Sequence, residues 1–162
     1  MEFREARLET MVKYDFSIYS GKKVFLTGHT GFKGSWMAYW LKELGAEVVG
    51  YSLPSNTEPN HFNLLNLSYK SYFENICNLN SLQKAIDDSQ PEIIFHLAAQ
   101  PLVRYSYQNP IETYQTNVLG TANVLEASRI NGKVKGVVVV TTDKCYENIE
   151  QEKEVKGKLR LQ

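Results

Sequence analysis

The fold is decided by Val24-Phe25-Leu26-Thr27-Gly28-His29-Thr30-Gly31-Phe32-Lys33-Gly34-Ser35-Trp36, in which a short apolar run meets a turn with three glycines. Apolar residues continue at helical spacing at Met37, Trp40, Leu41 and Leu44. Gly45 follows at a position that suits the end of a helix. A strand, a glycine-rich turn and a helix in this order predict a phosphate site, because the helix N-terminus offers unpaired N–H groups and the positive end of its dipole.

The spacing Gly28-x-x-Gly31-x-x-Gly34 gives each glycine a separate expected role. Gly28 allows the tight turn, Gly31 lets a pyrophosphate approach the backbone, and Gly34 lets the helix pack closely on the sheet. The spacing alone also suits an ordinary glycine-rich turn, but the flanking strand and helix favour a dinucleotide site. A Walker A loop is excluded, because the sequence contains no Gly-x-x-x-x-Gly-Lys.

The charge balance narrows the class of protein. The 162 residues include 18 Lys and Arg and 18 Asp and Glu, so the formal net charge is zero. This balance argues against generic binding to nucleic acids or to membrane surfaces. No apolar run approaches the roughly 18 residues of a transmembrane helix, and residues 1–7 lack the apolar core of a signal peptide. We therefore expect one cytoplasmic domain.

Cysteine and histidine usage indicates no metal site. Cys77 and Cys145 are the two cysteines, and neither lies in a CxxC pattern, so we expect neither a disulfide framework nor bound zinc. His29, His61 and His96 are scattered along the chain. Packing or hydrogen-bonding roles are therefore expected for the histidines.

Apolar runs alternate with helical patterns, which predicts an α/β fold: a Rossmann-like doubly wound parallel sheet, truncated after the fifth strand. The expected strands cover residues 23–27, 47–51, 71–77, 92–99 and 136–141, in the spatial order 3-2-1-4-5. Helices are expected at 33–44, within 61–69, around 82–86 and at 110–131. Residues 1–20 then form a lead-in, 21–148 the dinucleotide-binding domain, and 149–162 an atypical charged tail.

The helix at 110–131 has the clearest expected start. Asn109 suits the N-cap and Pro110 the first helical position, with Glu112 placed as in a capping box. Asn131-Gly132 suits its end. One apolar face is predicted along Ile111, Tyr114, Val118, Ala122 and Leu125.

Polar residues that could take part in catalysis follow the last expected strand. Right-handed crossovers bring Gly28, residues 98–100 and residues 141–144 to one edge of the sheet, where ligands bind in such folds. Thr142, Asp143 and Lys144 supply a hydroxyl, a carboxylate and an amine. Suitably shifted pKa values would let the acid and the amine exchange protons with a substrate. On these residues alone, a solvated turn with a local Asp–Lys pair is the favoured interpretation.

Three stretches resemble the CDP-glucose 4,6-dehydratases, a family within the extended short-chain dehydrogenase/reductase superfamily. They are the glycine turn GHTGFKGSW at 28–36, FHLAAQPLVRYSY at 95–107, and TTDKCYEN at 141–148. The resemblance covers about residues 21–148 and implies a cytoplasmic, homo-oligomeric lyase that uses NAD. It implies conversion of CDP-glucose to CDP-4-keto-6-deoxyglucose and water, a step toward deoxysugars of surface polysaccharides.

The resemblance also assigns residue roles. Thr142 would hydrogen-bond the oxygen on carbon 4 of the sugar, Asp143 would protonate the leaving hydroxyl at carbon 6, and Lys144 would remove the proton at carbon 5. The lysine must then be neutral, hence desolvated or beside another cation. Arg104 would contact a substrate phosphate, although a surface salt bridge explains it equally well. The expected cofactor-binding residues are Gly28, Thr30, Gly31, Phe32, Lys33, Gly34, Asn75, Ile76, Leu97, Ala98, Ala99, Gln100 and Thr141.

The sequence departs from the family pattern in three places. Ser52 follows Tyr51 where an acidic residue usually holds the adenosine ribose, and the absence of Lys and Arg from residues 50–69 favours NAD over NADP. Asn75-Ile76 stands where the family often has Asp-Ile facing adenine.

The third departure is the missing catalytic helix. The superfamily's Tyr-x-x-x-Lys does not follow the fifth expected strand, and its one occurrence, at residues 19–23, precedes the first. We therefore expect an N-terminal portion without the sugar-binding domain that is inactive alone. Another nucleotide-sugar epimerase or dehydratase, or a non-catalytic dinucleotide-binding remnant, are the alternatives.

Overall fold

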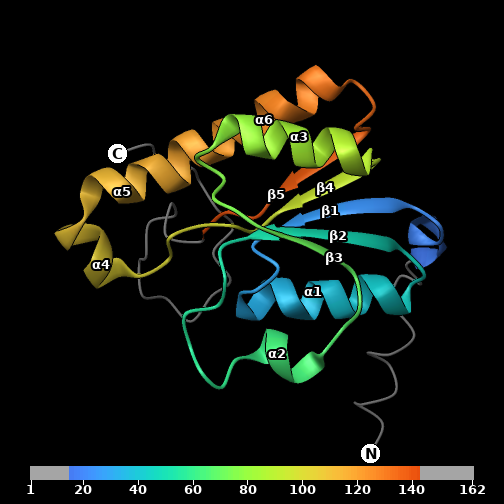
Figure 1. The fold of residues 1–162 in the computed structure, drawn as a ribbon, viewed down its shortest axis with the longest axis horizontal. Helices are drawn as coiled ribbons and strands as arrows, with labels where there is room; N and C mark the ends of the chain where they lie inside the picture. The colour runs from blue at the N-terminus through green and yellow to red at the C-terminus, as the bar shows by residue number, and fades with distance from the viewer. Residues whose placement is uncertain (1–14, 143–162) are drawn as a thin grey trace, which may run out of the picture.

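The strand β1 (Lys23–Thr27) lies at the centre of a five-stranded parallel sheet. The computed structural model describes residues 15–142. Val24, Phe25, Leu26 and Thr27 have no exposed surface, as the sequence predicts for a central strand. The strand order is β3-β2-β1-β4-β5, which confirms the predicted Rossmann-like arrangement (Figure 1).

The remaining strands are β2 (Glu47–Ser52), β3 (Lys70–Phe73), β4 (Ile93–His96) and β5 (Gly136–Val139). All pair in parallel; Leu26, for example, pairs with Gly50 on one side and with Phe95 on the other. β4 and β5 end earlier than predicted, because the chain leaves the sheet toward the ligand edge after His96 and Val139.

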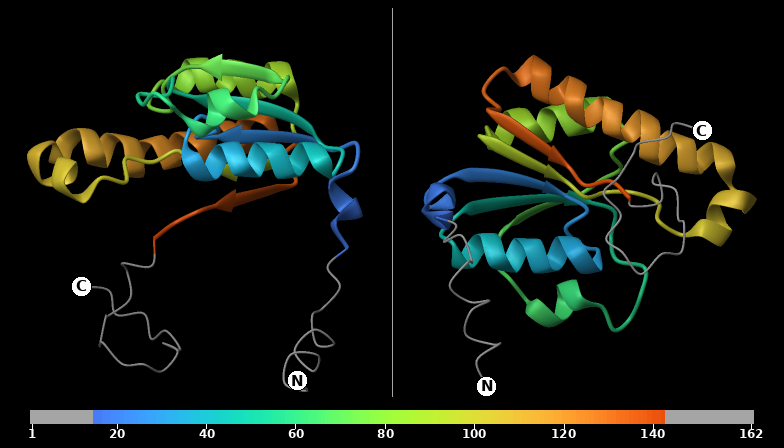
Figure 2. Two further views of the ribbon diagram at one scale, coloured as in Figure 1. Left: turned by 90° about the horizontal axis from the view of Figure 1, so that it is seen from below. Right: turned by 180° about the vertical axis from the view of Figure 1, so that it is seen from behind.

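Helices cover both faces of the sheet (Figures 1 and 2). One face carries α1 (Phe32–Glu43) and α2 (His61–Leu65), and the other carries α3 (Leu79–Ser89) and α6 (Gly120–Asn131). A hydrophobic core lies on each face of the sheet, and β1 contributes side chains to both. Val24 and Leu26 pack with Leu41 of α1, whereas Phe25 packs with Leu82 and Val124 on the other face. The period-two alternation of a strand therefore explains the two cores.

The segment between β4 and α6 is more broken than the sequence predicts. It consists of α4 (Val103–Gln108), α5 (Pro110–Tyr114) and a π-helical turn (Gln115–Leu119) that leads into α6. α4 and α5 extend past the carboxyl ends of the strands (Figure 1). A 3₁₀ turn (Phe16–Tyr19) precedes the sheet, within the predicted lead-in.

The predicted apolar face of the helix at 110–131 is wrong. Its members are all exposed: Ile111, Tyr114, Val118, Ala122 and Leu125. The buried positions are Gly120, Val124, Ala127 and Ser128. The π turn shifts the helical phase, so a single 3.6-residue period cannot be carried through the segment. Gly120 lies where Ile76 approaches, and a Cβ there would stand 2.5 Å from the Ile76 Cδ1.

The predicted capping box does not form. Asn109 is the N-cap of α5 and Pro110 its first residue, but the Asn109 side chain makes no capping hydrogen bond. The Glu112 carboxylate instead accepts a hydrogen bond from the Tyr105 hydroxyl at 2.6 Å. The end of α6 is as predicted, with Gly132 in the left-handed conformation at φ +68°.

The strand predicted at 71–77 stops at Phe73. The Asn75 side chain accepts a hydrogen bond from the Cys77 N–H at 2.9 Å, and this local turn replaces the strand. Ile76 is still buried, as its apolar character predicts, but in a turn.

The inner face of α1 also differs in detail. Gly34, Ser35, Ala38 and Leu41 are buried, because close packing on the sheet selects small residues. Trp40, one of the apolar residues at helical spacing, lies on the outer side, where the centroid of its ring is 4.9 Å from that of Phe16. Gly45 ends the helix at φ +79°, as predicted. Within residues 15–142, no helix has the length and apolar character needed to cross a membrane.

Neighbouring residues test the buried face of α6. Val124→Ala removes two methyl groups from a fully buried site and should lower the free energy of unfolding by about 2 kcal/mol. Leu125→Ala removes more apolar surface from an exposed site and should cost less than about 0.5 kcal/mol. Urea unfolding at low protein concentration measures both; equal losses would contradict the assigned face.

Candidate functional site

The turn after β1 is built around Gly28, which only glycine can occupy. Gly28 has φ +75°, and its N–H donates to the Tyr51 carbonyl at 2.9 Å. A Cβ at this position would stand 2.7 Å from the Ala98 nitrogen and 2.8 Å from the Leu97 carbonyl carbon. The turn is therefore pressed against the backbone that leaves β4.

Gly31 and Gly34 shape the start of α1. Gly31 is the N-cap and is exposed, and a Cβ on it would meet only the Gly28 carbonyl oxygen, at 3.3 Å. A Cβ on Gly34 would overlap that same oxygen. Gly34 thus lets the helix pack on the turn itself, where the sequence predicts packing on the sheet.

The first amides of α1 face the ligand edge. Its first intrahelical hydrogen bond runs from the Ser35 N–H to the Gly31 carbonyl at 2.9 Å, so the amides of Phe32, Lys33 and Gly34 precede it. Phe32 and Lys33 are exposed. Backbone donors with no Cβ in front of them at Gly31 fit a diphosphate.

Thr30 connects the turn to the end of β2. Its hydroxyl is bonded to the Ser52 hydroxyl at 2.9 Å and donates to the Leu53 carbonyl at 2.8 Å. Ser52, which stands where the family usually has an acidic residue, is thus hydrogen-bonded within the protein. Tyr51 beside it is buried and donates to the Asn75 carbonyl at 3.2 Å; burial raises the pKa of this phenol.

A buried chain of hydrogen bonds holds the end of β4. The Thr27 Oγ1 lies 2.7 Å from the His96 Nδ1, and the His96 Nε2 lies 2.9 Å from the Thr121 Oγ1. Thr121 donates its only hydroxyl proton to the Asn117 carbonyl at 2.8 Å, so it must accept from the His96 Nε2–H. The Thr27 Oγ1 already accepts two backbone N–H groups, from Leu97 and Ala98, so its own proton is donated to Nδ1 and the imidazole is neutral.

The same chain positions the backbone near the glycine turn. The Thr27 Oγ1 accepts hydrogen bonds from the Leu97 and Ala98 N–H groups, each at 3.2 Å. Burial lowers the pKa of His96, which favours the neutral ring that this pattern requires. Thr27, His96 and Thr121 are positioning residues for which the sequence offers no local signal, although His96 lies within the stretch at 95–107.

Gln100 is held by residues of the segment that follows. Its N–H donates to the Asn117 Oδ1 at 2.7 Å, and its carbonyl accepts from the Asn117 Nδ2 at 3.0 Å. The side-chain amide donates to Thr113 at 3.0 Å and accepts from the Leu102 N–H at 2.6 Å. Asn117 gave no sequence signal, because its role depends on the π turn.

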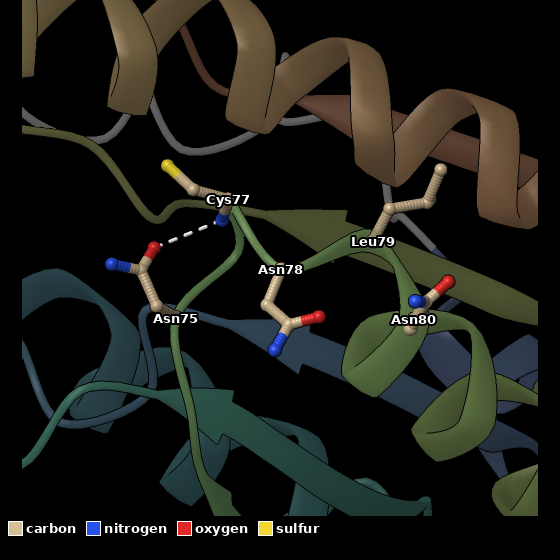
Figure 3. Close-up of a pocket in the computed structure, with 5 residues that line it drawn as sticks. All are labelled: Asn75, Cys77, Asn78, Leu79 and Asn80. Carbon is tan, nitrogen blue, oxygen red and sulfur yellow. Dashed lines mark hydrogen bonds between the residues drawn. The ribbon is translucent and has the colours of Figure 1, made fainter.

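The end of β3 borders a pocket of about 470 Å³ (Figure 3). It is lined by Asn75, Cys77, Asn78, Leu79 and Asn80. The predicted cofactor residue Asn75 thus lines an open hollow of the surface. Ile76 is not among the lining residues, because its side chain packs in the core.

The other predicted site residues lie around the same edge. Ala98 is half-buried and Ala99 exposed beyond β4, and Thr141 and Thr142 are exposed beyond β5, where the Val140 N–H donates to the His96 carbonyl at 3.0 Å. Asp143 and Lys144 lie outside the described residues.

Arg104 is exposed on α4, in the segment that extends past the strands. None of the ion pairs within residues 15–142 includes it. A group of three or more His, Cys, Asp or Glu arranged for a metal ion is likewise absent from that part of the chain.

His29 is fully buried inside the turn. Its ring packs against Phe62, Tyr69 and Phe73, and a Cβ on Gly50 would stand 2.5 Å from the ring. Neither ring nitrogen has a hydrogen-bond partner among the described residues. Burial lowers the pKa of His29 to about 4, and the nearby Tyr51 backbone opposes part of this shift. A packing role for this histidine agrees with the sequence-based expectation.

Comparison with known proteins extends this picture. Residues 25–157 match the family described as GDP-mannose 4,6 dehydratase. The chain is 50% identical over 138 residues to the CDP-glucose 4,6-dehydratase of Salmonella typhimurium, which covers 84% of this chain and 38% of that enzyme.

Solved structures show the same fold. The epimerase Mth375 of Methanothermobacter thermautotrophicus superposes with a TM-score of 0.72 at 26% identity, covering 83% of this chain and 39% of that one. The Bordetella bronchiseptica enzyme WbmH, solved in complex with NAD+, gives 0.69 at 28% identity, covering 86% and 46%. The chain spans about two fifths of the length of the curated relatives that it matches.

The burial of His29 predicts an acid-sensitive fold. The unfolded chain takes up a proton on this ring near pH 6.5, whereas the folded chain takes it up only near pH 4. The free energy of unfolding is therefore unaffected by protonation of His29 above pH 6.5. It falls by about 3 kcal/mol in total as the pH is lowered to 4.

His29→Phe keeps an aromatic ring without this titration. Between pH 7 and pH 4 the free energy of unfolding of the wild type should fall by about 3 kcal/mol more than that of this variant, as measured by urea unfolding. Tyr69→Phe, which alters a neighbour and leaves the imidazole in place, should keep the wild-type pH dependence. An identical pH dependence in His29→Phe would exclude this assignment.

Proposed function

The chain belongs to the GDP-mannose 4,6-dehydratase family, and from this membership we propose that it is the dinucleotide-binding portion of a CDP-glucose 4,6-dehydratase. The observation that carries the proposal is the 50% identity to the Salmonella typhimurium CDP-glucose 4,6-dehydratase, over a stretch that contains the complete glycine turn. The reaction of the whole enzyme converts CDP-glucose to CDP-4-keto-6-deoxyglucose and water.

The proposed cofactor is NAD. Its pyrophosphate would lie over Gly28, Gly31 and the first amides of α1, where the backbone donors are exposed and no Cβ intervenes. The end of β2 carries Ser52, and residues 50–69 contain no Lys or Arg that could hold a 2′-phosphate. When bound, NAD+ supplies reversible hydride acceptance.

The chain's own residues would position and protonate the sugar. Thr142 follows β5 at the edge that also carries Gly28 and Ala98, which supports its role as a hydrogen-bond partner of the oxygen on carbon 4. Asp143 would protonate the departing hydroxyl at carbon 6, and Lys144 would remove the proton at carbon 5. Ala98 and Ala99, with small side chains, would border the nicotinamide half, and Arg104 would approach a substrate phosphate.

Two other functions are alternatives. The structural relatives include epimerases, which need no acid and base for loss of water, so Asp143-Lys144 distinguishes the dehydratase from them. A remnant that binds a dinucleotide without catalysis is the other alternative, and the assay of the 162 residues described below tests it. We further propose a cytoplasmic homo-oligomer that acts on a nucleotide-sugar; light scattering of the purified chain tests the oligomeric state.

Calorimetry with NAD+ and NADP+ tests the cofactor. The chain should bind NAD+ weakly and prefer it over NADP+. Gly31→Val places a branched side chain in front of the helix amides and should weaken binding at least tenfold, or about 1.4 kcal/mol. Gly136→Val is the matched control, because a Cβ there meets nothing within 4 Å. Preference for NADP+, or unchanged binding by Gly31→Val, would refute the cofactor assignment.

Assays with CDP-glucose test the chemistry. The 162 residues alone should form no 4-keto product. Oxidation at carbon 4 needs a base, which in the superfamily is the Tyr of Tyr-x-x-x-Lys, and these residues do not contain that motif after the fifth strand. In a chimera continued with the remainder of the Salmonella enzyme, Lys144→Ala should retain NAD+ binding and slow deuterium incorporation at carbon 5 by about a hundred- to ten-thousand-fold.

Lys133→Ala is the control in that chimera, because Lys133 is exposed just after the C-terminal end of α6, away from the ligand edge. Product formation by the 162-residue chain, or full activity of the Lys144→Ala chimera, would show that the chemistry is misassigned.

A further inference from the structure

The helix α1 carries a second apolar face on the side away from the sheet (Figures 1 and 2). Its inner face consists of Leu41 and small residues that pack on the strands. On the opposite side, four aromatic residues follow at spacings of four, three and one, which places them along one side of a helix. These residues form the aromatic face of α1: Phe32, Trp36, Tyr39 and Trp40.

The aromatic face is exposed along its whole length. The exposed fraction of its members runs from 37% for Tyr39 to 70% for Phe32. Ring contacts lie only at its borders, where the centroid of Trp36 is 4.5 Å from that of His61 in α2 and the centroid of Trp40 is 4.9 Å from that of Phe16. These contacts orient the rings and leave them accessible. A continuous exposed aromatic surface is typical of a site that another protein covers.

The two ends of α1 carry opposite charges. Lys33 lies in its first turn and Glu43 is its last residue, about 15 Å further along the helix. Both side chains are exposed, and none of the ion pairs within residues 15–142 includes either of them. A cation at the N-terminus and an anion at the C-terminus are each unfavourable in the field of the helix dipole, so both gain from a partner of opposite charge.

A second copy of the same helix supplies those charges. In an antiparallel pair of α1 helices related by a two-fold axis, the register that places Lys33 opposite Glu43 of the second copy also places Trp36 opposite Trp40. The net charge of the chain is zero, so the two copies do not repel each other overall.

The exposed apolar residues of α6 offer a partner less. They include Leu125, but the charges beside it, Glu126 and Arg129, already pair with each other at 2.7 Å. We propose that the aromatic face of α1 is the surface through which two copies of this chain associate. This inference rests on the homo-oligomer proposed above and gives it an interface.

The tryptophans make this interface directly measurable, because the 162 residues contain two and both belong to the aromatic face. Sedimentation velocity without dinucleotide should show a concentration-dependent equilibrium between monomer and dimer. The tryptophan emission should shift to the blue over the same concentrations, since association removes the rings from water. Trp36→Ala should raise the dissociation constant of the dimer at least about thirtyfold, as for a tryptophan at the centre of an interface. Leu125→Ala is the control on α6 and should keep the wild-type constant.

Charge reversal provides a second test that keeps both tryptophans. Glu43→Lys places two lysines opposite each other at each end of the interface and should raise the dissociation constant about three- to tenfold. Adding Lys33→Glu restores opposite charges and should restore the wild-type constant. A local disturbance of α1 would not be repaired by a second reversal, so this rescue is specific to pairing between copies.

The outcomes separate the interface from the rest of the proposed function. A dimer that survives Trp36→Ala, that dissociates in Leu125→Ala, or that is not rescued by the double reversal would overturn the interface and leave the homo-oligomer standing. A wild-type chain that stays monomeric would overturn both, and tryptophans shielded from a soluble quencher in that monomer would show that another segment of the same chain covers the face. Dinucleotide binding is measured separately by calorimetry and stands or falls independently.

Discussion

The ligand edge depends on the close approach of two backbones, that of Gly28 and that of Leu97-Ala98. The distance leaves no room for a Cβ at Gly28, and the positive φ of this residue turns the chain directly into α1. Gly34 then lets the first turn of α1 pack on the same carbonyl. Together these contacts aim the amides of the helix N-terminus at the edge where the strands end, and every proposed contact with a diphosphate follows from them.

The polar interior of the sheet is organised around this approach. The Thr27 hydroxyl accepts hydrogen bonds from the two N–H groups that follow β4 and donates one to His96, which donates in turn to Thr121. Because each buried hydroxyl has a single proton, the direction of every bond in the chain is determined. His29 is the opposite case, a buried imidazole with no hydrogen-bond partner among residues 15–142, packed between three aromatic rings and Gly50. The turn that holds the site therefore also makes the fold sensitive to acid.

Local patterns predicted most of the architecture and the centre of the site. β1 and the glycine turn, the ends of α1 and α6 at Gly45 and Gly132, and the order of the strands all follow from apolar runs, turn residues and right-handed crossovers. The errors occur where a local irregularity changes the phase of a pattern. The π turn at Gln115–Leu119 rotated the buried face of α6, and the side-chain turn at Asn75 ended β3 early.

By itself the sequence determined the fold class, the position of the phosphate turn and the family, because these depend on residues adjacent in the chain or repeated at a fixed period. The tertiary structure alone decided which way the buried groups point. The tautomer of His96 depends on Thr27, 69 positions away, and on Thr121, 25 positions away. The burial of His29 depends on the missing side chain of Gly50 and on rings from α2 and β3. Hydrogen-bond direction and desolvation arise only when such distant groups meet, so they are properties of the packed molecule and cannot be read from neighbouring residues.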